Sequence, residues 1–414
     1  MNFKNFEGYK YIDGGVCAAK GFKANGLNCG LNKDKNKFDL GLVYSEVECN
    51  TAAVYTVNKV KAAPILVTKA NLQQTDNKAK AIIANSKNAN ACNKDGEEKA
   101  WKMCKLVDEE LNIKQEEVIV ASTGVIGQSL PIEFIESSMK ELVLGLDENG
   151  NQKAANAIMT TDTFLKENAV EFNINNKICH LGGMAKGSGM IHPNMATTLN
   201  FITTDVAISC ELLNKALREI TNITYNCLSV DGDTSTNDMV CVLASGMAQN
   251  VEIKEENEDY EIFKKSLYIV MMNMTRMLAK DGEGATKLLE CTCSGATSLD
   301  VAIKVAKSVI GSSLFKYAMF GEDANWGRIL CAIGYADAEF DINKVDVSLS
   351  SVNGKIEVCK DGYGVPFSEE YAKEVLSKDE IFINIDLKSG DYEASSWGCD
   401  LTYDYVKING DYRS

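Results

Sequence analysis

The sequence predicts a mixed α/β or α+β protein. Strand patterns alternate with helical patterns along most of the 414 residues, and the C-terminal part is rich in strands. With 31 glycines and only four prolines, the turns between elements depend on glycine. Such alternation favours helices packed on sheets, because each element must bury its apolar side against another element. The length allows one large domain or two of ordinary size.

Composition excludes several classes of partner. The formal net charge of −15 argues against nucleic acid and anionic membranes, which both require clustered lysine and arginine. The 14 cysteines contain no C-x-x-C pair, and Met1–Lys20 does not resemble a signal peptide. We therefore expect free thiols in the cytoplasm. Two histidines, His180 and His192, are too few for a histidine-rich metal site, and no metal is expected.

The N-terminal third predicts strands, a turn and one clear helix. Leu40–Tyr44, Ala52–Val57 and Ala81–Ala84 have strand composition, and the asparagine-rich Asn85–Cys92 suits a turn. Apolar residues at helical spacing predict an amphipathic helix over Glu97–Leu111.

The strand predicted over Val118–Ala121 leads into Ser122-Thr123-Gly124. A hydroxyl and a free backbone N–H at such a tight turn can stabilise an oxyanion. By pattern alone, the same residues also fit a simple joint between a strand and the next helix. Helical patterns follow over Pro131–Leu144 and Ala154–Ile158.

A hairpin then leads to the centre of the chain. Val170–Ile174 and Lys177–Leu181 are strands joined through Asn175-Asn176. Lys186 follows among glycines without an acidic neighbour, so it is available for a ligand carboxylate, although a solvated surface lysine fits equally. Just upstream, Thr160, Thr161 and Thr163 could bind a polar ligand or only make turn hydrogen bonds.

The C-terminal half continues the alternation of strands and helices. Asp231–Asp238 resembles the start of an EF-hand calcium-binding loop, but Thr236 and Val242 occupy the positions of the required glycine and glutamate. A polar rim or capping loop is therefore predicted. Glu283, between two glycines, is open to a ligand amine, and the alternative is a helix end closed by Gly282. The helices are predicted near Ser209 as N-cap, over Glu258–Lys280 and over Leu299–Ile310; the strands are Leu228–Val230, Leu288–Cys293, Val345–Leu349, Lys355–Val358, Glu380–Leu387 and Leu401–Ile408.

The stretch from Lys186 to Asp205 organises the chain. Its first half is a glycine loop, and the strand from Thr198 follows directly. A hydroxyl at Thr197, after the small Ala196 and before a buried strand, suggests a precursor that cuts itself and exposes Thr197 as an N-terminal nucleophile. A plain glycine loop entering a core strand gives the same pattern.

This stretch, KGSGMIHPNMAT, closely resembles the processing site of the ornithine acetyltransferases, the bifunctional acetyltransferases of arginine biosynthesis. Further similar blocks extend the resemblance from Gly14 to Ser414. It implies layered sheets flanked by helices, on a self-processing scaffold with an N-terminal threonine nucleophile. It also implies cleavage between Ala196 and Thr197, giving fragments 1–196 and 197–414, with two copies of each in the assembly.

The resemblance also implies roles for single residues. Thr197 is the nucleophile, and Thr123 with Gly124 forms the oxyanion hole. The implied substrate-binding residues are Thr161, Lys186, Thr197, Glu283, Asn409 and Ser414.

The implied reaction is a ping-pong transfer of acetyl from N2-acetylornithine to glutamate through an acetyl-threonine enzyme, without a cofactor. Some family members also use acetyl-CoA as donor, and no feature of the sequence separates these two kinds.

Two departures from the family pattern lie near this chemistry. Thr198 stands where methionine is usual, which makes it a second candidate nucleophile, and Lys87 stands where glycine is usual. A competing interpretation is an N-terminal-nucleophile amidase or aminopeptidase that passes the acyl group to water. A non-catalytic protein with an uncut chain is a third. A serine hydrolase motif fails around Ser188, because Lys186 occupies the first glycine position.

Overall fold

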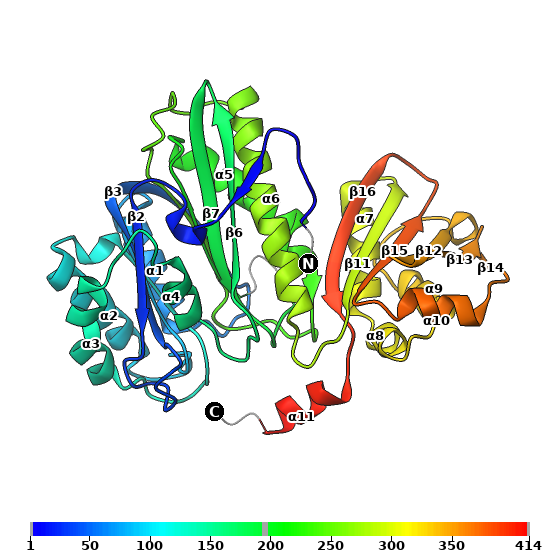
Figure 1. Ribbon diagram of the computed structural model, residues 1–414, viewed down its shortest axis with the longest axis horizontal. Coiled ribbons are helices and arrows are strands. Elements are labelled where there is room, and N and C mark those ends of the chain that lie inside the picture. Colours follow the sequence, from blue (N-terminus) through cyan, green and yellow to red (C-terminus); the bar gives the residue numbers. More distant parts are fainter. Residues whose placement is uncertain (1–2, 193–197, 412–414) are drawn as a thin grey trace.

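The computed structural model describes residues 3–192 and 198–411 and arranges them in two β-sheets with flanking helices (Figure 1). In the described chain the first sheet has nine strands in the order β1-β6-β7-β8-β10-β3-β4-β5, with β2 paired to β3. These strands are β1 (Lys10–Ile12), β2 (Phe22–Leu27), β3 (Leu40–Tyr55), β4 (Lys78–Asn85), β5 (Val118–Ser122), β6 (Lys166–Ile174), β7 (Lys177–Lys186), β8 (Leu199–Thr204) and β10 (Met239–Ala244).

The first sheet is buried on both faces. Ile202 and Val240 pack among apolar side chains of α5 and α6, while their neighbours Phe201 and Cys241 pack on the opposite face with residues of α4. Burial on both sides explains why these strands are apolar along their length. The helices of this part are α1 (Ala63–Gln74), α2 (Gly96–Leu111), α3 (Ile132–Leu144), α4 (Asn151–Ala157), α5 (Cys210–Ile223) and α6 (Glu258–Lys280).

The second sheet is formed mainly by the C-terminal third of the chain. Its strand order is β14-β13-β12-β15-β11-β16-β9, and a separate apolar core lies between it and its helices. The strands are β9 (Leu228–Ser229), β11 (Leu288–Ala296), β12 (Asp346–Ser351), β13 (Gly354–Lys360), β14 (Tyr363–Gly364), β15 (Glu380–Asp386) and β16 (Tyr392–Cys399). The helices are α7 (Leu299–Gly311), α8 (Ser313–Phe320), α9 (Trp326–Gly334), α10 (Glu369–Leu376) and α11 (Tyr403–Asp411), and short 3₁₀ turns lie at Gly15–Cys17, Gln115–Glu117, Tyr225–Cys227 and Ile342–Lys344.

The predicted fold class is confirmed, and so are most predicted elements. The long helix α6 has the predicted bounds, and Ser209 caps α5 by accepting a hydrogen bond from the Leu212 N–H. The hairpin between β6 and β7 turns at Asn175 and Asn176, whose φ angles of 50° and 61° are left-handed. Asparagine tolerates this region, which a primed hairpin turn requires.

One prediction from pattern was wrong, and several elements were missed. Leu401–Ile408 is not a strand but mostly lies in α11, which runs from the second sheet back toward the first (Figure 1). Thr402 starts this helix by accepting the Tyr405 N–H at 3.4 Å, so a local cap overrides the alternating apolar pattern. The pattern also missed α1, which begins at Ala63 with Pro64 in its first turn. It missed the helices α8, α9 and α10 and the strands β10, β14 and β16 as well.

The central loop joins β7 to β8, and these strands pair antiparallel from Leu181↔Thr204 to Lys186↔Leu199. A cut after residue 196 would therefore divide one sheet between two fragments rather than separate the two sheets. Pairing of β8 and β10 with β7 and β3 would hold such fragments together. All 14 cysteines are free thiols. None of the helices in the described ranges is long and apolar enough to cross a membrane.

Candidate active site

A cavity of about 130 Å³ lies where the ends of β5 and β7, the loop before β10, the α6–β11 loop and α11 meet. Six residues predicted from the sequence line it although they are far apart along the chain. These six are Thr123, Gly124, Thr161, Lys186, Glu283 and Asn409. The remaining predicted site residues, Ala196, Thr197 and Ser414, lie outside the described residues.

One side of the cavity offers two hydrogen-bond donors. The backbone N–H of Thr123 is used by the Asn85 carbonyl at 2.9 Å. The Thr123 hydroxyl accepts a hydrogen bond from Lys186 Nζ at 3.2 Å, which leaves its own hydrogen for a ligand. Among the described residues nothing accepts the Gly124 N–H. The Thr123 hydroxyl and the Gly124 N–H, which we call the donor corner, can together bind an oxyanion.

Gly124 cannot be replaced at this corner. Its φ of 131° is left-handed, and a Cβ there would lie 2.2 Å from the carbonyl carbon of Lys87. The backbone of the 85–92 turn thus approaches the donor corner as closely as a glycine permits. This close approach gives the Ser122-Thr123-Gly124 motif its physical reason.

Side-chain amides hold the turn in place behind the donors. Asn85 Nδ2 donates to the Asn88 carbonyl at 2.9 Å, and the Ser122 hydroxyl donates to Asn85 Oδ1 at 2.6 Å. Asn237, from the loop before β10, donates to the carbonyls of Ala89 and Ser122 at 2.6 and 2.8 Å. The asparagine-rich turn is therefore part of the site. Asn237, which the sequence predicted only as a member of a polar rim or capping loop, is a supporting residue.

Lys87, which replaces the usual glycine of the family, has a left-handed φ of 73°. This conformation costs an L-residue about 1–2 kcal/mol, and glycine avoids that cost. Glycine also has a larger entropy in the unfolded state, which cancels part of the gain in stability. We expect the free energy of unfolding of Lys87→Gly to be about 1 kcal/mol higher than that of Lys87→Ala, because alanine keeps the strained Cβ. Denaturant unfolding of the two variants measures the difference, and equal stabilities would show that the Cβ is unstrained.

Lys186 is the cation of the cavity. Its side chain is buried, and burial lowers the pKa of its amine, although Asp162 opposes this effect. Among the described residues no carboxylate lies within ion-pair distance of its Nζ. A buried amine without a paired acid favours an anionic ligand, which agrees with the predicted role in holding a substrate carboxylate.

Glu283 is the acid of the same cavity. Its Oε2 accepts a hydrogen bond from Asn409 Nδ2 at 2.8 Å, and its backbone N–H donates to the Ser188 carbonyl at 3.0 Å. A Cβ on Gly189 would lie 2.4 Å from Glu283 Oε2, so this glycine makes room for the carboxylate. Lys186 and Glu283 thus present opposite charges to one small space, which suits a ligand with both a carboxylate and an amine.

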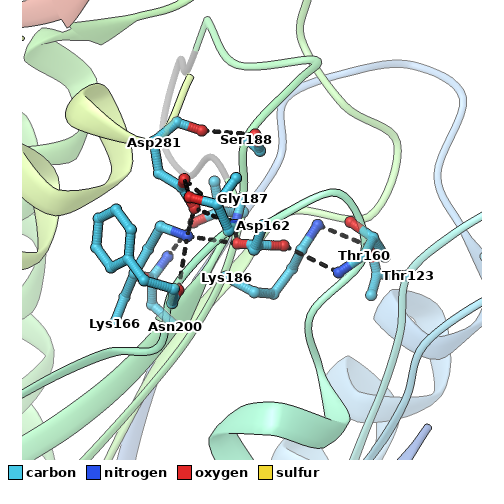
Figure 2. Close-up of polar contacts among 12 residues, drawn as sticks. Thr123, Thr160, Asp162, Lys166, Lys186, Gly187, Ser188, Asn200 and Asp281 are labelled. Carbon is cyan, nitrogen blue, oxygen red and sulfur yellow. Dashed lines mark hydrogen bonds and ion pairs between the residues drawn. The ribbon is translucent and has the colours of Figure 1, made fainter. Parts of the chain in front are cut away.

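A buried ion triad lies behind the residues that line the cavity, with Asp162 directly following Thr161 in the chain (Figure 2). Lys166 Nζ contacts Asp162 Oδ1 at 2.6 Å and Asp281 Oδ2 at 2.5 Å. Burial alone would raise the pKa of Asp162, but the charges of Lys166 and Lys186 outweigh it and lower the pKa to about 2. Asp162 also accepts the Gly187 N–H at 2.7 Å, so the triad fixes the start of the central loop.

The structure narrows the choice among the three neighbouring threonines. The hydroxyl of Thr163 donates to Asp281, so it is occupied within the triad. Thr160 and Thr161 both line the cavity. Thr161 therefore remains a substrate-binding candidate, and Thr160 is available beside it.

Pattern reasoning missed the supporting residues Asp162, Lys166 and Asp281, and it did not single out Asp238. Asp162 lies in a loop and Lys166 begins β6, so their four-residue spacing is not a helical pair and gave no local signal for the triad. Asp231 and Asp238 were predicted only as members of a polar rim or capping loop. Asp231 indeed accepts the N–H groups of Met190 and Ile191, at 2.6 and 2.9 Å, and so caps the central loop.

Comparisons with known proteins show to which family the chain belongs. Residues 23–414 match the model of the ArgJ family. The chain is 49% identical over 404 residues, 97% of this chain and 99% of the relative, to "Arginine biosynthesis bifunctional protein ArgJ" of Caldanaerobacter subterraneus subsp. tengcongensis. It is 52% identical over 394 residues, 95% of this chain and 96% of the relative, to "Arginine biosynthesis bifunctional protein ArgJ 1" of Clostridium acetobutylicum.

A solved structure is similar as well. The crystal structure of arginine biosynthesis bifunctional protein argJ from Bacillus halodurans has 45% sequence identity and a TM-score of 0.50. The match covers 52% of this chain and 100% of that chain. The family and the relatives that the chain matches are acetyltransferases of arginine biosynthesis, so the chain is an enzyme of the acyltransferase class. Within that class, this chain belongs to the ArgJ family.

Proposed function

We propose that this protein transfers acetyl from N2-acetylornithine to glutamate in arginine biosynthesis, after cutting its own chain between Ala196 and Thr197. The observation that carries the proposal is the cavity, which unites the oxyanion donors with Lys186 and Glu283 from separate segments. An acetylated amino acid matches this space: its carboxylate suits Lys186, its acetyl oxygen suits the Thr123–Gly124 corner, and a side-chain amine suits Glu283.

Cutting supplies the general base that the nucleophile needs for acetyl transfer. The Thr197 hydroxyl attacks the Ala196 carbonyl, the C–N bond breaks with its proton returned to nitrogen, and water hydrolyses the resulting ester. The product is a Thr197 α-amine, for which the reference pKa is about 7.7–8.0. This amine can therefore accept the proton of its own hydroxyl near neutral pH, and no histidine is required.

Acetyl transfer then runs in two halves. The Thr197 oxygen attacks the acetyl carbonyl of N2-acetylornithine, the oxyanion is stabilised at Thr123 and Gly124, and ornithine leaves with the proton on its amine. The amine of glutamate next attacks the acetyl ester, which gives N-acetylglutamate and restores the free hydroxyl. Both halves use the same donor corner, so one cavity serves both substrates.

One fact supports a cut chain, and another shows how its fragments would stay together. The Bacillus halodurans structure is matched in full by 52% of this chain, and a fragment from Thr197 to the end would likewise be just over half. The strand pairing across β7 and β8 would keep both fragments in one folded unit. We also propose an assembly of two copies of each fragment, located in the cytoplasm, and acetyl-CoA as a second acetyl donor.

Mass spectrometry of the intact protein under denaturing conditions tests the cut. We expect two species that sum to the full chain plus one water, the second beginning at Thr197. Native size-exclusion chromatography with light scattering should show both fragments eluting together at twice the mass of one cut chain. A single uncut mass in active protein would overturn the self-processing proposal.

A product assay tests the transferase against the amidase or aminopeptidase alternative. With labelled N2-acetylornithine and glutamate, the label should appear in N-acetylglutamate, whereas an amidase would release labelled acetate regardless of glutamate. Repeating the assay with acetyl-CoA and glutamate decides the second donor. Labelled acetate as the main product would replace our proposal by the amidase.

Thr123→Ala should lower kcat for acetyl transfer by about 10²–10³-fold, because one oxyanion donor is lost. The substrate KM should change much less, since Lys186, Thr161 and Glu283 remain. Thr123→Ser, which keeps the hydroxyl, is the matched control and should retain most of the activity. Equal kcat values for Thr123→Ala and Thr123→Ser would show that the Thr123 hydroxyl is not part of the oxyanion hole.

A further inference from the structure

The cavity of the candidate active site has two apolar side chains, Ile126 and Met190, which we call the apolar rim. Among the described residues that line this cavity all the others are polar, charged or glycine. Ile126 is 39% exposed and Met190 is 46% exposed, so both border the opening of the cavity to solvent. Neither belongs to an apolar core of the described chain. Apolar side chains left in water at a cavity mark a surface that a ligand can cover.

Met190 is held in an unfavourable backbone conformation. Its φ of 56° is left-handed, a region that glycine adopts freely and that an L-residue with a side chain avoids. The residue before it is a glycine, because a Cβ on Gly189 would collide with the Glu283 carboxylate. A methionine at the next position, where glycine would be unstrained, indicates that its side chain serves the site.

The backbone on both sides of Met190 is fixed. The Met190 N–H donates to Asp231 Oδ2 at 2.6 Å, and the next N–H, of Ile191, donates to Asp231 Oδ1 at 2.9 Å. The Ile191 carbonyl accepts the Val230 N–H at 2.7 Å. The Met190 side chain therefore projects from an anchored backbone although it is itself exposed.

Ile126 is anchored in the same way. The Val125 N–H donates to the Lys87 carbonyl at 3.2 Å, and the Gly127 N–H donates to the Ala91 carbonyl at 3.0 Å. The two neighbours of Ile126 are thus tied to the asparagine-rich turn behind the donor corner. Both members of the rim are placed by hydrogen bonds of their neighbours rather than by packing of their own side chains.

The two rim residues border different ends of the cavity. Ile126 lies two residues after Gly124, whose N–H belongs to the donor corner. Met190 directly follows Gly189, which makes room for Glu283. Three methylene groups join the α-carbon of N2-acetylornithine to its side-chain amine. With the acetyl oxygen at the donor corner and the amine at Glu283, these methylenes have to pass the apolar rim.

We propose that the apolar rim selects the acetyl donor by the length of its aliphatic chain: Ile126 packs on the methylenes nearest the α-carbon, and Met190 packs on the last methylene before the amine. This inference rests on the proposed function and specifies its donors as N2-acetyl diamino acids with three methylene groups. Covering methylenes with apolar side chains supplies binding energy in proportion to the area buried. One methylene too many or too few in such a pocket changes kcat/KM by about 10–200-fold.

A series of three donors tests the inference. N2-acetyl-2,4-diaminobutyrate, N2-acetylornithine and N2-acetyllysine have two, three and four methylenes, and kcat/KM is measured for each with glutamate as acceptor. The wild type should prefer the ornithine donor by at least about 10-fold over each of the others. Met190→Ala opens the amine end, so its preference for ornithine over lysine should fall to about 3-fold or less. Met190→Phe narrows the same end and should shift the preference toward diaminobutyrate.

Ile126→Ala separates the two ends of the rim. All three donors share the methylenes nearest the α-carbon, so this variant should lower kcat/KM for each of them by a similar factor, about 10-fold, and leave their ratios unchanged. Val251 is 75% exposed and does not line the cavity, so Val251→Ala is the control and should keep wild-type values. Each ratio comes from one enzyme preparation, so incomplete cutting of a variant cancels.

The outcomes distinguish the inference from the proposed function. A wild type without preference among the three donors would overturn the inference. Ratios within about 2-fold of the wild type in both Met190 variants would overturn it as well. A wild type that transfers acetyl to glutamate from none of the three donors refutes the proposed function instead.

Discussion

Thr197→Ala is expected to leave the chain uncut and to abolish acetyl transfer. The substitution removes the nucleophilic oxygen that the proposed mechanism uses both to cut the chain and to carry the acetyl group. An uncut chain also lacks the α-amine that serves as base. Intact mass should show one species of full length, and the product assay should show no N-acetylglutamate above background. The effect is the largest we predict, because no other group of the site supplies a covalent intermediate.

Two neighbouring variants make this result specific. Thr197→Ser keeps a hydroxyl and should still cut and transfer. Thr198→Ala should also still cut, because the Thr198 hydroxyl already accepts a hydrogen bond from Asn200 Nδ2 at 2.5 Å and has a structural role. Cutting in Thr197→Ala together with an uncut Thr198→Ala would move the nucleophile to Thr198.

Lys166→Met should destabilise the protein by about 3–5 kcal/mol, because it leaves the carboxylates of Asp162 and Asp281 buried without their cation. Methionine preserves the apolar stem, so the loss reports the charge. The folded-state pKa of Asp162, about 2, is below its ordinary value. In the wild type its contribution to stability is therefore present above pH 4 and is lost as the pH falls toward 2. Denaturant unfolding at several pH values should show this dependence in the wild type and not in Lys166→Met.

A surface ion pair provides the control for this prediction. Lys99 lies 2.7 Å from Asp95 in a partly exposed pair, and Lys99→Met should cost at most about 1 kcal/mol. The Gly187 N–H donates to Asp162, and the Ser188 hydroxyl donates to the Asp281 carbonyl. Because these contacts hold the start of the central loop, Lys166→Met should slow cutting as well. Similar small losses in both variants would show that the triad adds no stability beyond that of a surface pair.

Local sequence was sufficient to predict many of the helices and strands. Helix α6, the Ser209 cap and the Asn175–Asn176 turn follow from contacts within a few residues of each other, and such contacts are readable in a pattern. The same reasoning failed at α11, where apolar alternation resembled a strand although a cap at Thr402 starts a helix. Local patterns also did not predict which strands pair, since the parallel alignment of β8 with β10 joins segments about forty residues apart.

The sequence by itself determined the fold class and, through the resemblance of its motifs, the family and six residues of the cavity. The tertiary structure alone decided how these residues meet: Lys186 on the Thr123 hydroxyl, Asn409 on Glu283, and Lys166 between two aspartates. It also brought Asp238 to the amide that follows Thr197. The physical reason is that buried charges and unpaired polar groups acquire their energies from neighbours distant in the chain, which no local pattern records.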